Sequence, residues 1–123
     1  MPDDLWPANI ADSKMTTPVI ILKEQAALLG EKTRNLVQGE VLTQAVGSMF
    51  VHHFYLTAPT LNYKYELFQA SHSINFYPMS LRVGQQEGRT AMNEEQFKEE
   101  LKAIFASQHT LNVVHSILAQ VRA

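Results

Sequence analysis

The chain of 123 residues contains no cysteine. A disulfide framework, a thiolate metal site and a cysteine nucleophile are therefore excluded. Long apolar runs are also missing, because the longest strongly apolar helical stretch covers only residues 19–22, against the roughly 20 residues that span a bilayer. The N-terminus carries Asp3 and Asp4 where a secretory leader would carry cations. These absences predict a soluble cytoplasmic protein with no membrane association.

Clustered basic residues are absent as well. The ten lysines and arginines are scattered from Lys14 to Arg122, and the formal net charge is −2. A surface that follows phosphates needs grouped cations, so we do not expect a nucleic-acid partner. The Gly30-Glu31-Lys32-Thr33 segment lacks the glycines of a phosphate-binding loop, and no nucleophile elbow, zinc-protease helix, dinucleotide fingerprint or calcium loop occurs. We expect no cofactor.

What the chain does have is enough apolar material for one core. Hydrophobic residues make up 46% of it and charged residues 18%, a balance typical of a globular domain of this length. Residues 1–16 carry two prolines and three aspartates without apolar periodicity, which predicts an irregular arm before a single domain over residues 17–123. Trp6 lies in this arm. Since a large indole is seldom left in water, we expect Trp6 to pack on its own chain or on a second copy.

Helical periodicity marks both ends of the domain, and β-branched and aromatic residues fill the middle. Thr17-Pro18 predicts a helix start, and Asn93 with Gln96 predicts a second helix, followed by a third from Leu111. Breaks between these helices divide four strands near residues 36–46, 49–58, 63–70 and 76–83. Short connections favour an antiparallel meander. The prediction is an α+β fold of order α-β-β-β-β-α-α, with all helices packed on one sheet face.

Histidines stand at positions 52, 53, 72, 109 and 115. His52 and His53 are neighbours on a strand, so they point to opposite faces and cannot share one metal ion. His109 and His115 are six apart, which is not the spacing of two ligands on one helix turn. We expect no metal site, and we expect His52 to be a hydrogen-bonded histidine of the core.

The strand at residues 49–58 is apolar on both of its alternating sides, which predicts cover on both faces of the sheet. If residues 59–62 form a hairpin loop, Ala58 pairs with Tyr63, Tyr55 with Glu66 and His53 with Phe68. We call the side of the sheet away from the helices the outer face. The candidate residues on it or close to it are His53, Tyr55, Glu66, Phe68, Glu40 and Arg82. A slip of one residue would put His52 there in place of His53.

Aromatic area mixed with charge is typical of a subunit interface or a ligand cleft. The first hypothesis is a small protein-interaction module that forms a homodimer through the outer face, with Trp6 as a further contact. The alternative is a small-molecule-binding protein or enzyme, in which His53 is an acid or base oriented by Glu66 or Tyr55 and Arg82 holds an anion. A third reading is a solvated face with incidental pairs. We expect a binding module and not an enzyme.

Overall fold

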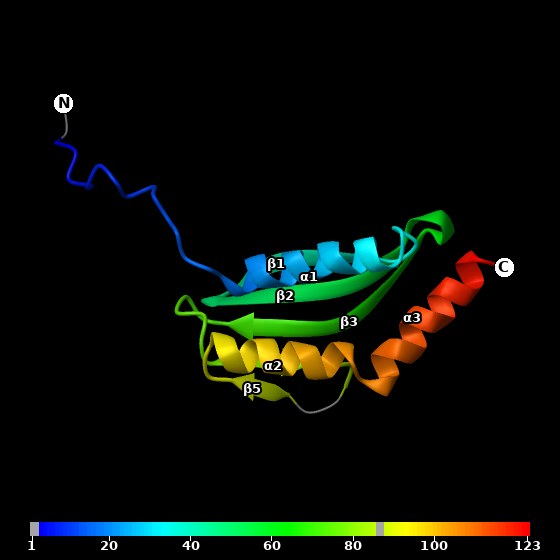
Figure 1. Cartoon of the computed structure of the whole chain (residues 1–123). Coiled ribbons are helices and arrows are strands. Elements are labelled where there is room, and N and C mark those ends of the chain that lie inside the picture. The colour runs from blue at the N-terminus through cyan, green and yellow to red at the C-terminus, as the bar shows by residue number, and fades with distance from the viewer. Residues whose placement is uncertain (1–2, 86–87) are drawn as a thin grey trace.

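The computed structural model describes residues 3–85 and 88–123. Within them, an N-terminal helix precedes an antiparallel sheet of order β1-β2-β3-β4-β5, and two helices follow (Figure 1). The elements are α1 (Pro18–Lys32), β1 (Gln38–Val46), β2 (Met49–Ala58), the short 3-10 helix η1 (Pro59–Leu61), β3 (Tyr63–His72), β4 (Met79–Arg82), β5 (Arg89–Ala91), α2 (Glu94–Phe105) and α3 (Gln108–Val121). No described helix is both long and apolar enough to cross a bilayer.

The α+β class with one antiparallel sheet is confirmed, but the prediction of four strands is wrong. A fifth strand, β5, pairs with β4 in the segment between the predicted fourth strand and the helix at Asn93, where no strand was predicted. Its three residues are too few to show an alternating pattern, and only Ala91 among them is buried. The fourth strand is also shorter than predicted, since β4 covers four residues and not residues 76–83.

The C-terminal helices begin where side chains cap them. The Asn93 Oδ1 atom accepts a hydrogen bond from the backbone N–H of Gln96 at 2.8 Å, and the Gln96 side chain accepts one in return from the N–H of Met92. Ser107 caps α3 by accepting from the N–H of Thr110. Because of this cap, α3 starts at Gln108, three residues before the predicted start at Leu111.

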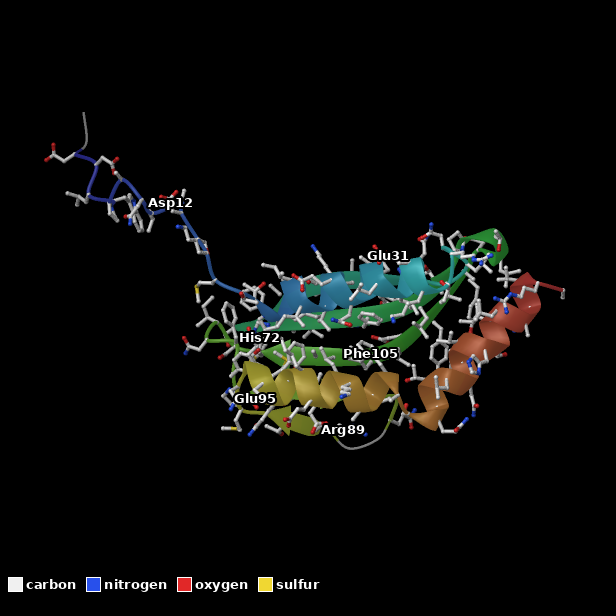
Figure 2. All side chains as sticks on the ribbon, in the orientation of Figure 1. Asp12, Glu31, His72, Arg89, Glu95 and Phe105 are labelled. Carbon is white, nitrogen blue, oxygen red and sulfur yellow. The ribbon has the colours of Figure 1, made fainter. Side chains whose placement is uncertain are left out.

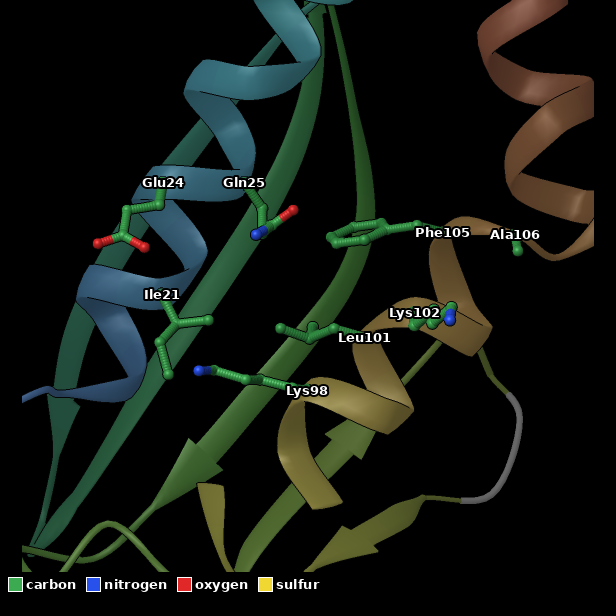
Figure 3. Close-up of a pocket in the computed structure, with 8 residues that line it drawn as sticks. All are labelled: Ile21, Glu24, Gln25, Lys98, Leu101, Lys102, Phe105 and Ala106. Carbon is green, nitrogen blue, oxygen red and sulfur yellow. The ribbon is translucent and has the colours of Figure 1, made fainter. Parts of the chain in front are cut away.

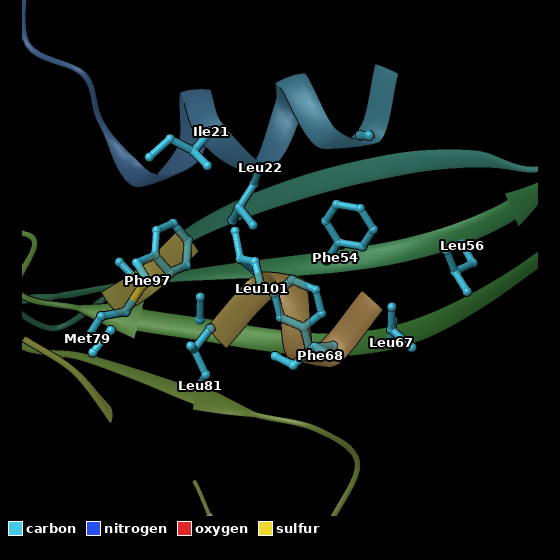
Figure 4. Close-up of a cluster of buried hydrophobic side chains, with 14 of the residues drawn as sticks. Ile21, Leu22, Phe54, Leu56, Leu67, Phe68, Met79, Leu81, Phe97 and Leu101 are labelled. Carbon is cyan, nitrogen blue, oxygen red and sulfur yellow. The ribbon is translucent and has the colours of Figure 1, made fainter. Parts of the chain in front are cut away.

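All three helices contribute to a single core on one face of the sheet (Figure 4). On the sheet side, the Phe54 and Phe68 rings stack with centroids 5.1 Å apart. Leu22 of α1 and Leu101 of α2 belong to the same cluster, and both are buried. The fully buried side chains of the core include Phe54, Phe68, Phe97, Leu22, Leu56, Leu67, Met79, Leu81 and Ile104. The core therefore joins both ends of the chain to the same sheet face.

Close contact between α1 and β1 depends on a residue without a side chain. A Cβ atom added at Gly39 would lie 2.5 Å from the Cα atom of Ala26 and 2.6 Å from its Cβ atom. Real Cβ atoms do not approach backbone so closely, so the helix would have to move. Gly39 therefore sets the distance between α1 and the sheet.

The first prediction concerns this contact. Gly39→Ala should lower the free energy of unfolding by about 1–3 kcal/mol, because the added methyl group forces α1 away from the sheet. Urea unfolding followed by circular dichroism measures the change. Ile74→Ala, at an exposed position on the loop after β3, is the control and should stay within about 0.5 kcal/mol of the unchanged protein. A neutral Gly39→Ala variant would contradict the packing described above.

The N-terminal arm, residues 3–16, projects away from the body (Figure 1), and Figure 2 shows Asp12 well separated from the helices and the sheet. Trp6 is 71% exposed and Leu5 is 90% exposed. Trp6 thus does not pack on its own chain, which was one of its two expected positions.

Candidate functional site

The outer face is formed by residues that alternate with the core along each strand. Two rows of cross-strand partners lie at its centre: Leu42, His53, Gln69 and Arg82 in one, and Glu40, Tyr55 and Glu66 in the other. Partners directly opposite each other share a face, so these side chains form one continuous surface. Five of the six predicted sheet residues are therefore brought together.

The sixth, Phe68, is a correction. Ala58 pairs with Tyr63 and Tyr55 with Glu66 as predicted, but a β-bulge follows and Phe68 pairs with Phe54. Leu67 is the extra residue of the bulge. Because of it, two consecutive side chains, Leu67 and Phe68, both point into the core and are buried. His53 consequently lies opposite Gln69 and not Phe68. Counting residue pairs back from the hairpin loop assumes one partner per residue. A bulge breaks this assumption, and every pair beyond it shifts by one residue.

His53 is held by two neighbours on adjacent strands. Its Nδ1 atom lies 2.5 Å from Oε1 of Glu66, and because a carboxylate can only accept, Nδ1 carries the hydrogen. Its Nε2 atom lies 3.1 Å from Oε1 of Gln44. The His53 side chain is 15% exposed and that of Glu66 is 37% exposed. The imidazole is thus fixed in orientation at the surface of the sheet.

Tyr55 continues this network toward the hairpin end of β2 and β3. Its ring stacks on His53 with centroids 6.1 Å apart, and the Lys64 ammonium group lies 4.2 Å from the centroid of the Tyr55 ring. The same ammonium group donates to Glu40 at 3.3 Å. Sequence reasoning did not select Gln44 and Lys64 as site residues. Their outward positions followed from the alternation of β1 and β3, but only the register shows which partners they reach.

Exposed apolar side chains lie beside the polar network. Leu42, Val46 and Met49 are all among the exposed large hydrophobic residues; Val46 and Met49 lie at the turn of the β1–β2 hairpin, and Leu42 lies in the middle of β1. Arg82 lies at the other side of the face, opposite Gln69 on β3. The outer face therefore combines an apolar flank, an ordered polar centre and a cation at its far side.

Two further histidines, His52 and His72, contact each other on the core side of the same sheet. His72 Nδ1 is 2.6 Å from the carbonyl oxygen of Ser73, so this nitrogen donates and His72 Nε2 accepts. His52 Nε2 then donates to His72 Nε2 at 2.7 Å, and His52 Nδ1 accepts from the Thr43 hydroxyl at 2.8 Å. Four groups form one satisfied chain with both imidazoles neutral. His52 is 3% exposed, as expected of a hydrogen-bonded core histidine.

Burial lowers the pKa of His52 to about 4 from its ordinary value of 6.5, and electrostatic repulsion from the positive forms of His72, His53 and Lys23 lowers it further. In the folded protein, His52 is therefore neutral above about pH 4. Among the described residues, no three His, Cys, Asp or Glu side chains group in a way that could hold a metal ion.

The main pockets of the described chain lie away from the outer face. The two between the helices are lined by residues of α1, α2, α3 and the core strands. The others are lined by different residues, and none of them includes His53, Tyr55 or Glu66.

The chain matches no protein-family model, and comparisons with curated proteins and with solved structures find no significant similarity. The site's geometry and chemistry must therefore carry the functional argument.

A double-mutant cycle tests the coupling across the outer face. His53→Gln and Glu66→Gln should each lower stability slightly, and the double variant should show a coupling energy of about 0.5–1 kcal/mol, since the pair is partly solvated. Urea unfolding of the four proteins at pH 7 gives this value. The pair Glu94 and Lys98, joined on the surface of α2, is the control and should couple by about 0.5 kcal/mol or less. Additive effects at His53 and Glu66 would mean that the two side chains do not act together.

The pH dependence of stability tests the inner pair. His52 binds a proton below about pH 6.5 when unfolded but only below about pH 4 when folded. The unfolded state holds more protons in this window, so stability should fall as the pH drops from 6.5 to 4, by about 3 kcal/mol from His52. Urea unfolding at several pH values measures the slope. His52→Gln should remove that part, whereas the control His53→Gln should keep it. Equal slopes for the unchanged protein and His52→Gln would contradict this assignment.

Proposed function

We propose that this protein is a small interaction module of the cytoplasm that forms a homodimer through the outer face. The observation that carries the proposal is that helices cover only one of the two sheet faces. All three helices contribute to the core on one face, whereas no described element covers the other. Yet the outer face holds ordered side chains and exposed leucine, valine and methionine, and such surfaces are typical of sites that bind a protein.

A second copy of the chain is the partner that fits the charges of this face. Two carboxylates, Glu40 and Glu66, lie beside two cations, Lys64 and Arg82. In a two-fold dimer each copy presents the same patch, so the patch must complement itself. A balanced set of charges next to an apolar flank meets that requirement better than a patch of one sign.

A small-molecule site or an enzyme centred on His53 is the second candidate. The contact of 2.5 Å with Glu66 favours it, because a carboxylate that fixes an imidazole is a common arrangement for an acid or base. A reaction also needs a cavity that holds a substrate and excludes water. The main pockets do not include His53, so this candidate ranks below the protein interface.

Sedimentation velocity over a range of concentrations tests the dimer. Leu42→Glu puts a charge in the apolar flank and should weaken self-association by at least about tenfold, which is about 1.4 kcal/mol. Ile74→Glu, an equally drastic change at an exposed position on the loop after β3, is the control and should associate normally. Both sites are exposed, so both variants should fold.

A chain that stays monomeric at high micromolar concentration would overturn the proposal. His53→Ala separates the two candidates: the dimer proposal expects weaker association, and an unchanged dimer that loses a small-molecule ligand would favour the second candidate.

A further inference from the structure

We propose that the N-terminal arm of one copy binds in the groove between α1 and the C-terminal helices of a second copy. This inference goes beyond the outer face, which it does not use. The groove is defined by two adjoining pockets on the helix side of the sheet, and both are lined by Gln25 and Phe105. Their volumes are about 580 and about 300 Å³. Figure 3 shows the larger one between α1 and α2, with Ile21 and Leu101 facing each other across it.

The smaller pocket is the more apolar part of the groove. Its lining includes Leu28, Leu29, Leu56, Leu67, Leu111 and Val114, and the Phe54 ring forms part of the floor. Leu28 and Leu111 remain 42% and 39% exposed, on α1 and α3 respectively. These two helices therefore leave an apolar strip between them that no described part of the chain covers.

The arm carries the matching apolar side chains. Leu5, Trp6 and Ile10 are all exposed by 60% or more. Two local hydrogen bonds order the backbone beside them: the Trp6 N–H donates to Asp4, and the Ile10 N–H donates to the carbonyl of Pro7. An indole and two aliphatic side chains held in water are costly unless a partner removes them from it.

Charge complementarity favours the arm as the occupant. Residues 3–16 contain three aspartates and one lysine, a net charge of −2. The groove is lined by Lys32, Lys98 and Lys102 and by one carboxylate, Glu24, which Figure 3 shows pointing away from the groove. Glu94 partly neutralises Lys98 at 3.5 Å, which leaves Lys32 and Lys102 as the principal cations. An acidic, apolar segment fits this lining.

The exit of the arm favours a second copy over the arm's own groove. Thr17 is extended, as the residue before a proline prefers, and it also caps α1 by accepting from the Ile20 N–H. This fixes the direction in which the chain leaves the helix, away from the groove (Figure 1). A return would need a tight turn in residues 13–16, where Ser13 is the one residue of the types that favour turns. Reciprocal exchange between two copies would instead give a closed dimer.

The arm is long enough for this contact. Fully extended, residues 3–10 reach at most about 28 Å, and the turn closed by the hydrogen bond from the Ile10 N–H to Pro7 shortens this span. The part of α1 that borders the groove, residues 21–32, covers about 17 Å along the helix axis. Residues 3–10 can therefore lie along the groove while residues 11–16 bridge the two copies.

Trp6 is the single tryptophan of the chain, so its fluorescence reports on the arm alone. The full-length Leu42→Glu variant is the background, because association through the outer face is weakened there and the two proposals can fail separately. Its emission maximum should shift to shorter wavelength as concentration rises, in step with dimer formation measured by sedimentation. Leu111→Gln in this background should move the midpoint of both curves to about tenfold higher concentration. Ile74→Gln is the matched control and should leave the midpoint unchanged.

Three results would overturn the proposal. Emission typical of a solvated indole at every concentration would mean that the arm stays free. A short-wavelength maximum in a monomer, independent of concentration, would mean that the arm folds onto its own chain. A concentration-dependent shift that Leu111→Gln leaves unchanged would place Trp6 elsewhere on the second copy. Circular dichroism of the Leu111→Gln variant verifies that it is folded.

Discussion

The seating of α1 on β1 is the contact on which the arrangement of this molecule depends. Gly39 lets Ala26 approach the strand so closely that a methyl group has no room between them. This approach lets α1 close the core from the N-terminal side, while α2 closes it from the C-terminal side. Because helices from both ends of the chain are placed on one face, the other face has no cover from the described residues, and its chemistry decides what the protein can bind.

Two adjacent histidines illustrate how strongly the faces differ. His52 lies in the core, where a chain of hydrogen bonds to Thr43 and His72 satisfies it in the neutral form. His53, one residue later, lies on the outer face and contacts Glu66 and Gln44. Strand geometry alone separates them. The His52–His72 pair contributes to folding stability, whereas the partly solvated His53–Glu66 pair contributes little.

Most of the fold followed from the sequence, since long periodic segments determine their own structure. The helix caps at Thr17 and Asn93 and the face assignment of His53 are of this kind. The errors share a different cause. Phe68 was assigned to the outer face because the count from the hairpin loop assumed strict alternation along the strand, which the β-bulge at Leu67 breaks. The β5 strand was missed because three residues cannot display a period. Lys64 and Gln44 were not selected because side-chain partners across strands depend on the register, which a sequence pattern specifies only locally.

The central claim, that the outer face is covered by a second copy, is tested most directly by nuclear magnetic resonance with a soluble paramagnetic probe. Such a probe broadens the signals of exposed side chains, so it shows for each residue whether its side chain is exposed or covered. At low concentration Leu42, His53 and Tyr55 should all be broadened. At high concentration the account predicts that these three are protected while Ile74, an exposed residue outside the outer face, remains broadened. Equal broadening of the outer-face residues at both concentrations would contradict it.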